Sequence, residues 1–210
     1  MPCKSSTSST SAAMQRTRFK PPALRWALAT CVLWASCSAQ ALTVFTCGPE
    51  WAALVRELAP QAQVRSATHS RQDPHHIEAR PSLIAALRRA DLAVCSGAGL
   101  EAGWLPMLQQ RAGNPQVQPG AAGLLMAADH VKLLDPRPAG AGPFAGDVHE
   151  QGNPHLHLDP RRLAEVARVL SDRLQAIDPP RKEAYRARLA AWESDWRGRI
   201  VGWERRAAPL

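Results

Sequence analysis

The sequence predicts an α/β fold, in which a parallel sheet flanked by helices is followed by one long α-helix. Short apolar runs alternate with segments whose apolar residues recur at helical spacing. Parallel strands need a crossover between them, and this alternation supplies helices of the right length. The end of the chain differs, because one apolar stripe there continues over about 28 residues, the length of a long helix.

The first elements are clear in the pattern. LTVFTC at 42–47 is an apolar strand that ends at Gly48-Pro49, and a helix with apolar residues on one face follows at 50–59. A weaker strand is expected at 62–68. The remaining pattern predicts, in order, a loop at 69–81, a helix at 82–90, a buried strand at 91–97, a helix at 100–113 and a short strand within 114–126.

Residues 129–159 change character. They hold four prolines and four glycines, which is typical of a long surface loop. Long loops in compact domains often carry function.

Two helices close the chain, each preceded by an Asp-Pro pair at 159–160 and 178–179. The stripe on the second helix consists of Tyr185, Leu189, Trp192, Trp196, Ile200 and Trp203, and core packing is its simplest interpretation.

The N-terminal segment, residues 1–41, reads as a signal peptide. A basic, polar stretch precedes the apolar run WALATCVLWA, and Ala39 and Ala41 then occupy the small-residue positions of a cleavage site. We therefore expect export to the periplasm with cleavage after Ala41; Met14 is an alternative start. Leu33-Trp34-Ala35-Ser36 before Cys37 is a poor lipoprotein box, so lipid anchoring is not favoured.

The net charge of +8 comes largely from this segment. Without it, 21 basic residues stand against 18 acidic ones, a balance that does not call for a nucleic-acid partner.

Cleavage of the signal peptide would also leave two cysteines, Cys47 and Cys95. Each ends a predicted strand, so a disulfide is feasible in an oxidising compartment, and two separate buried thiols are the alternative.

All seven histidines lie between residues 69 and 157. Imidazole is a good ligand for zinc and similar divalent metals, and a site needs three or four ligands. The spacing fits neither a zinc finger nor the HExxH motif, so ligands would have to converge from separate loops. Two segments stand out, DPHHIEARPS at 73–82 and GNPHLHLDP at 152–160, because in each a proline precedes a histidine and a helix follows.

These two segments, together with ADLAVCSGAGLE at 90–101 between them, resemble the zinc- and manganese-binding proteins of ABC importers, the ZnuA or TroA type. The resemblance covers 42–210, and any one motif is weak while the ordered set is specific. It implies a first, metal-binding lobe at 42–160 and a helical segment at 161–210 that includes the long linking helix.

Carried over position by position, the resemblance implies two ligands in this lobe, His75 and His155. The candidate auxiliary ligands are His149, His157 and His76, of which His76 is expected rather as a neighbour; the family usually has an aromatic residue where His157 stands. His69 and His130 are expected at the surface. The histidine excess favours Zn²⁺ over Mn²⁺. The implied role is non-enzymatic: metal capture in the periplasm and delivery to a membrane permease.

The family completes its site from a second lobe, and this sequence contains no match to one, so a truncated importer component is expected. Three other functions stay open: a free-standing periplasmic metal buffer, a non-functional remnant, and a metal-dependent hydrolase that uses His155 and His157 as an H-x-H pair. The last requires that pair on a strand.

Overall fold

The computed structural model describes residues 41–136 and 149–209. The strands are β1 (Thr43–Thr46), β2 (Gln63–Ser66), β3 (Leu92–Cys95) and β4 (Leu124–Met126). The α-helices are α1 (Pro49–Leu58), α2 (Pro81–Arg88), α3 (Leu105–Ala112), α4 (Pro160–Ile177) and α5 (Lys182–Ala207), with short 3-10 helices η1 (Pro115–Val117), η2 (Ala127–His130), η3 (Leu156–Leu158) and η4 (Pro179–Arg181).

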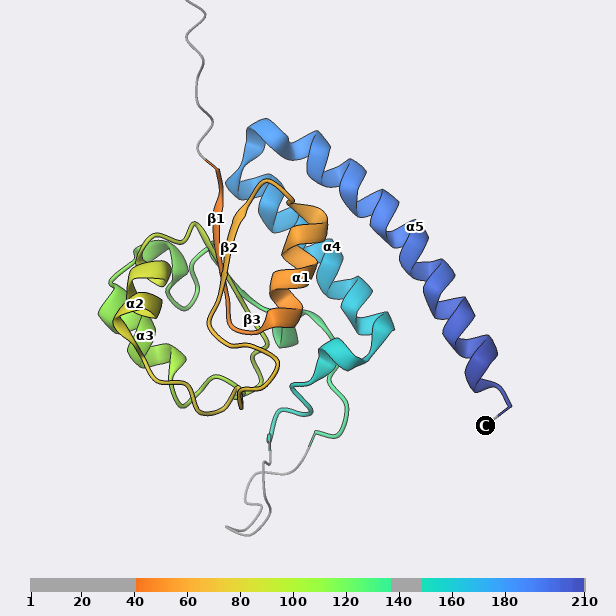
Figure 1. The fold of residues 1–210 in the computed structure, drawn as a ribbon, viewed down its shortest axis with the longest axis horizontal. Coiled ribbons are helices and arrows are strands. Elements are labelled where there is room, and N and C mark those ends of the chain that lie inside the picture. Colours follow the sequence, from red (N-terminus) through yellow and green to blue (C-terminus); the bar gives the residue numbers. More distant parts are fainter. Residues whose placement is uncertain (1–40, 137–148, 210) are drawn as a thin grey trace, which may run out of the picture. The chain divides into compact units, whose positions relative to one another are not determined.

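The strands form one parallel sheet in the order β2-β1-β3-β4. Helices cover both faces, with α1 and α4 on one side and α2 and α3 on the other (Figure 1). The predicted fold class is therefore confirmed: a parallel sheet flanked by helices, followed by a long helix. Because all strands run the same way, the loops after them gather at one edge of the sheet.

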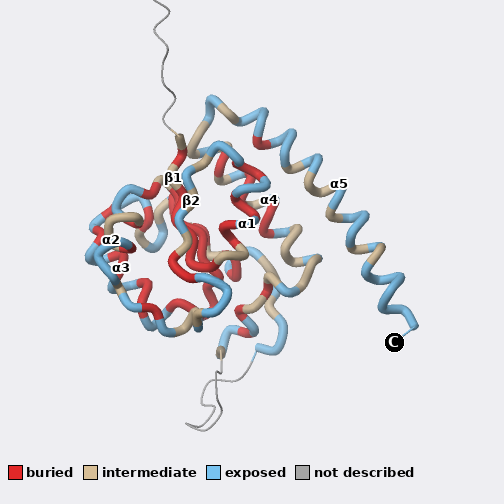
Figure 2. The backbone as a smooth tube through the Cα atoms, in the orientation of Figure 1, coloured by how far each residue is buried: buried red, intermediate tan, exposed pale blue. Residues whose placement is uncertain are grey.

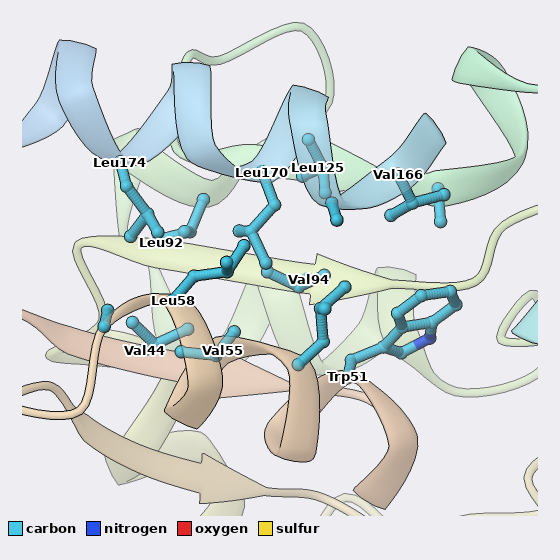
Figure 3. Close-up of a cluster of buried hydrophobic side chains, with 14 of the residues drawn as sticks. Val44, Trp51, Val55, Leu58, Leu92, Val94, Leu125, Val166, Leu170 and Leu174 are labelled. Atoms are coloured by element: carbon cyan, nitrogen blue, oxygen red, sulfur yellow. The ribbon is translucent and has the colours of Figure 1, made fainter. Parts of the chain in front are cut away.

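The larger core lies between the sheet and helices α1 and α4 (Figure 3). Val44 and Val94 project from β1 and β3 toward Trp51 on α1 and Leu170 on α4, and all four side chains are fully buried. Every residue of β3 is buried, as expected for a central strand covered on both faces. This core fixes the position of α4 and hence of the loop that precedes it.

Helices α2 and α3 cover the opposite face. Their apolar residues pack with Phe45 and Ala93, which alternate along the strands with the residues of the first core. Asn114 closes this side, because its amide donates to the carbonyls of Leu87 (3.0 Å) and Ala90 (2.8 Å) at the end of α2.

Helix α5 packs against α4 and also contacts α1. Its first turns are anchored by the buried Tyr185, whose hydroxyl donates to the Asp178 carboxylate at 2.6 Å. Burial, followed by this hydrogen bond, raises the pKa of Tyr185 to about 12. Further along, Trp196 donates to the Pro160 carbonyl (2.8 Å), while Trp203 is 38% exposed. Most of α5 beyond its first turns is exposed or half-buried (Figure 2). The stripe thus packs on the body at its start and becomes more exposed toward its end.

The structure differs from the sequence-based prediction at one helix. The pattern suggested a helix from residue 100, whereas α3 begins at Leu105. Gly97, Ala98 and Gly99 have positive φ angles, and the Glu101 side chain accepts hydrogen bonds from the backbone N–H groups of Ser96 and Gly97. The side chain thereby favours a turn over another helical turn.

The expected signal peptide lies outside the described residues, apart from Ala41, as does the middle of the expected surface loop, 137–148. Within the ranges that the structure describes, no helix combines the length and apolarity that a membrane span requires.

Candidate metal centre

Three segments converge at the carboxyl edge of the sheet and bring histidines together. Residues 67–80 follow β2 and carry His75, and residues 96–104 follow β3. Residues 149–159 lead into α4 and carry His149, His155 and His157. Neighbouring ring centroids within this four-histidine cluster lie 5.3 to 6.3 Å apart.

His75 is held by its own loop. Asp73 accepts two hydrogen bonds from it, one from the backbone N–H (2.9 Å) and one from Nδ1 (2.7 Å). Trp104 fixes the same loop from the other side, because its indole N–H donates to the Pro74 carbonyl at 2.9 Å. Pro74 restricts the backbone just before the histidine. The imidazole is thereby oriented with Nε2 free to bind.

His149 is held from the segment after β3. Its Nδ1 lies 2.9 Å from the carbonyl oxygen of Ala98, a residue with φ of 51°. Gly99, which follows Ala98, has φ of 83°, a backbone conformation that favours glycine. Gly152, three residues after His149, has φ of 123°. A Cβ there would come within 2.6 Å of the Leu133 side chain, so the turn requires glycine.

The Nε2 atoms of His75 and His149 face each other at 3.1 Å. The Asp73 carboxylate is ionised at neutral pH, because hydrogen bonds from the His75 backbone N–H and then from the rings of His76 and His75 hold its pKa well below its usual range. An ionised carboxylate and a backbone carbonyl can only accept, so the Nδ1 atoms of His75 and His149 both carry hydrogen.

Each neutral imidazole has one hydrogen, so both Nε2 atoms then point lone pairs at each other. Such a pair is unfavourable unless a proton or a metal ion lies between the nitrogens. Two nitrogens bound to one tetrahedral zinc, each at about 2.0–2.1 Å, are separated by roughly 3.4 Å. The observed 3.1 Å is close to that spacing. A metal ion bound to both nitrogens, or a proton shared between them, would fit this spacing.

His155 lies beside the pair, with its ring 6.3 Å from that of His75 and 6.0 Å from that of His157. Its backbone N–H donates to Asn153 Oδ1 at 2.9 Å, and η3 follows directly. Burial and then the neighbouring imidazoles lower the pKa of His155, which favours the neutral form that binds metals. Downstream, Asp159 caps α4 by accepting from the N–H groups of Arg161 and Arg162.

His157 packs edge-on against Trp51, with ring centroids 6.3 Å apart. Trp51 is itself fixed, because its indole N–H donates to Ser96 Oγ at 2.9 Å. His157 Nδ1 is buried and, among the described residues, has no hydrogen-bond partner. A buried nitrogen of this kind is costly unless something binds it.

Among the predicted site residues, His76 adjoins the cluster, with its ring centroid 6.2 Å from that of His75, but it is exposed. Its side chain is 82% exposed and its Nδ1 contacts Asp73 at 3.0 Å. His69 and His130 are exposed, as the sequence suggested. Asp73 was not among the predicted site residues, although it orients His75. The aspartate two positions before the histidine was the available signal.

Cys47 and Cys95 are joined by a disulfide, with Cα atoms 4.8 Å apart. The register explains their approach, since Thr46 pairs with Val94 and Cys47 N–H donates to the Val94 carbonyl at 2.9 Å. Thr68, at the start of the His75 loop, is joined to this disulfide, because its Oγ1 donates to the Cys47 carbonyl at 2.8 Å. The disulfide thus ties together the bases of two site segments.

Replacing Asp73 with asparagine is expected to weaken zinc binding about tenfold, near the low end for residues that orient metal ligands, because Asp73 is exposed. The amide oxygen can still accept hydrogen bonds from His75, but the side chain loses the charge that polarises the ring. A competition titration with a chromogenic chelator measures the change. Glu78→Gln removes an exposed carboxylate from the same loop and should leave affinity unaltered; equal effects of both variants would refute the orienting role.

The chain has relatives among proteins of known family. Residues 44–206 match the family model described as the zinc-uptake complex component A, periplasmic, or ZnuA. The chain belongs to the ZnuA family. Its curated relative, the high-affinity zinc uptake system protein ZnuA of Yersinia pestis, is 30% identical over 131 residues, which cover 57% of this chain and 41% of the relative. The chain thus spans less than half the length of that protein.

Solved ZnuA-like structures share the fold. A zinc-bound ZnuA deletion mutant superimposes with a TM-score of 0.62 at 23% identity, over 75% of this chain and 55% of that one. A manganese-bound periplasmic metal-binding protein of Candidatus Liberibacter asiaticus superimposes with a TM-score of 0.61 at 17% identity, over 79% and 56%. At these identities the likeness concerns the fold alone.

Proposed function

We propose that this chain is the periplasmic solute-binding component of a zinc importer and that it captures Zn²⁺ with His75, His149 and His155. The observation that carries the proposal is the His75–His149 pair, whose Nε2 lone pairs face each other at 3.1 Å. Membership of the ZnuA family and the neighbouring His155 support it. The function is binding without chemistry on the ion.

Zinc is proposed over manganese because of the donor set. Imidazole nitrogens suit zinc, whereas manganese prefers carboxylate and water oxygens. The carboxylate nearest to the pair, Asp73, is occupied by hydrogen bonds from His75 and His76. His157, with its buried Nδ1, is a candidate fourth nitrogen.

Capture and release follow from imidazole chemistry. A histidine binds metal only when neutral, so acidification opposes binding and metal uptake displaces protons. The lowered pKa of His155 keeps it neutral at a more acidic pH than a free histidine. The rigid loops around His75 and His149 reduce the entropy lost when the ion binds.

Export precedes this function in the proposal. Cleavage after Ala41 would leave β1, which begins at Thr43, intact within the compact unit Ala39–Leu210. The domain organisation then comprises a signal peptide at 1–41, a metal-binding lobe at 42–160 and a helical segment at 161–210. The partner would be the membrane permease of an ABC importer.

The hydrolase alternative receives no support from the described residues. His155 and His157 flank and lie in the 3-10 helix η3, whereas the H-x-H pair of those enzymes lies on a strand. Metal capture for import remains the function that the geometry favours.

Growth under zinc limitation tests the importer role. A strain that lacks the gene should grow poorly with a zinc chelator present, and the unaltered gene should restore growth. The His75→Ala, His155→Ala double variant should not restore it, while His76→Ala should. Full restoration by the double variant would contradict the proposal, and restoration by zinc but not manganese supplementation would support the choice of metal.

A further inference from the structure

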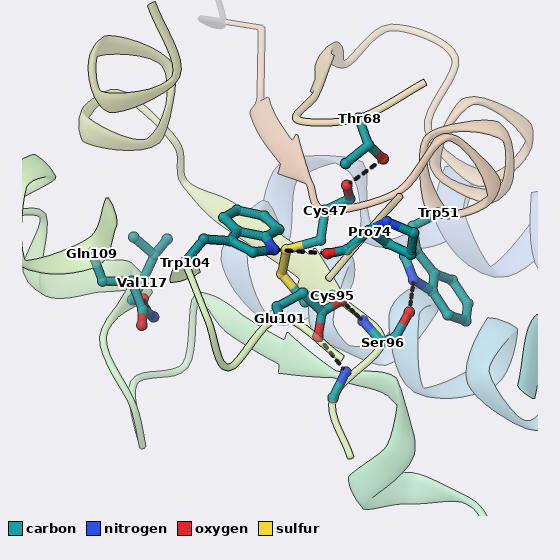
Figure 4. The surroundings of a disulfide bond; sticks show 11 residues. Cys47, Trp51, Thr68, Pro74, Cys95, Ser96, Glu101, Trp104, Gln109 and Val117 are labelled. Carbon is teal, nitrogen blue, oxygen red and sulfur yellow. Dashed lines mark hydrogen bonds between the residues drawn. A yellow bond between two sulfur atoms is a disulfide. The ribbon is translucent and has the colours of Figure 1, made fainter. Parts of the chain in front are cut away.

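A second group of metal-ligating side chains lies around the Cys47–Cys95 disulfide (Figure 4). The sulfur atoms of Cys47 and Cys95 and a carboxylate oxygen of Glu101 all lie within 4.8 Å of one another. All three residues are buried, with exposed fractions of 2%, 0% and 3%. The histidine site uses none of these atoms.

We propose that reduction of the Cys47–Cys95 disulfide opens a second divalent-metal site, made of the two thiolates and the Glu101 carboxylate. Thiolate ligands select zinc and softer ions such as cadmium, and a carboxylate is an accepted third ligand for zinc. A water molecule would complete four-coordination. The redox state of one bond would then decide how many metal ions the lobe holds.

The chemistry balances with a dithiol as reductant. Its two thiols transfer two electrons and two protons to the disulfide, which becomes two cysteine thiols while the dithiol becomes a disulfide. A divalent ion then binds both sulfurs and displaces the two thiol protons to solvent. Re-oxidation by a disulfide expels the metal and restores the Cys47–Cys95 bond.

The charge of the buried centre favours this exchange. Burial raises the pKa of Glu101, while the hydrogen bonds from the Ser96 and Gly97 N–H groups oppose that rise. With Glu101 ionised, the oxidised centre holds a neutral disulfide and one carboxylate, one negative charge in all. Two thiolates, the carboxylate and a divalent cation also sum to one negative charge. Replacing the disulfide bond by a metal dithiolate therefore buries no additional charge, so the large desolvation cost of a new buried ion is avoided.

The scaffold already holds the third ligand. The two oxygens of Glu101 accept from the backbone N–H groups of Ser96 (2.8 Å) and Gly97 (2.9 Å), which fixes the carboxylate beside the sulfurs. Oxygens that accept from N–H retain lone pairs for a metal. Two sulfurs bound to one tetrahedral zinc, at about 2.3 Å each, are roughly 3.8 Å apart, so the two thiolates must separate from bonding distance after reduction to hold the ion.

Cobalt binding to the reduced chain tests the proposal. Co²⁺ substitutes for zinc, and sulfur-to-cobalt charge transfer gives near-ultraviolet absorption that imidazole ligands do not. The chain is used with Cys3, Cys31 and Cys37 replaced by serine, reduced with dithiothreitol and desalted without oxygen. We expect two free thiols, one more bound Co²⁺ than in the oxidised chain, and the charge-transfer band in the reduced chain alone.

Three variants separate this site from the histidine cluster. The band should disappear in Cys47→Ser, Cys95→Ser, and Glu101→Gln should weaken cobalt binding about tenfold or more. The charge-transfer band should persist in the His75→Ala, His155→Ala double variant, whether or not the proposed zinc function holds.

A folded, reduced chain with two free thiols and neither the band nor the additional cobalt overturns the proposal. Circular dichroism decides the case in which reduction unfolds the lobe: recovery of the helical signal and the band on adding Co²⁺ supports the site, and failure to recover overturns it.

Discussion

Replacing His75 with alanine is expected to weaken zinc binding by at least about a hundredfold, more than the loss of a residue that only orients a ligand. His75 supplies one of the two Nε2 atoms that face each other at 3.1 Å, and its ring also adjoins that of His155. Alanine removes one ligand and leaves His149 without its counterpart. Competition against a chelator of known affinity measures the change.

His76→Ala is the matched control for this prediction. It removes an imidazole from the adjacent position, whose ring lies 6.2 Å from that of His75 but is 82% exposed and contacts Asp73 through Nδ1. We expect zinc affinity to change by less than about threefold, well below the effect of losing a residue that orients a ligand. A loss in His76→Ala as large as that in His75→Ala would mean that the ligand assignment is wrong.

Replacing Leu170 with alanine is expected to lower the free energy of unfolding by about 2–5 kcal/mol, the range for buried leucines. Leu170 is fully buried where α4 meets the sheet and α1 (Figure 3), so its loss leaves a cavity that close neighbours fill only in part. Because α4 follows directly on the segment with His155 and His157, the variant should also bind zinc less well near its unfolding midpoint. Urea unfolding monitored by circular dichroism measures the free energy.

Leu158→Ala provides the comparison for Leu170→Ala. Leu158 is 76% exposed, so its truncation should change stability by no more than about 0.5 kcal/mol, as is usual for surface substitutions. A similar loss of stability in both variants would contradict the assignment of the core to the α4 interface.

Much of the fold could be predicted from the sequence because the periodicities are strong. The buried run around Val94 and the apolar stripe that begins at Tyr185 each allow one secondary structure. The start of α3 could not be predicted, because it depends on Glu101 folding back onto the Ser96 and Gly97 N–H groups. Local propensity does not report such a side-chain contact.

The candidate site was predictable in part. Pro-His pairs drew attention to His75 and His155, but the approach of His149 to His75 spans 74 residues and depends on the Ala98 carbonyl after β3. No local sequence pattern predicts a contact between residues so far apart in the chain. The sequence also left the state of the two cysteines open, since only the register of β1 against β3 brings Cys47 beside Cys95.

Calorimetric titration of zinc into the oxidised chain, with the His75→Ala, His155→Ala double variant beside it, tests the central claim most directly. The claim is that the histidine cluster of this lobe captures one metal ion. We expect binding of one zinc ion per chain, with displacement of protons, that disappears in the double variant. Absent binding in the unaltered chain, or equal binding in both proteins, would contradict the claim.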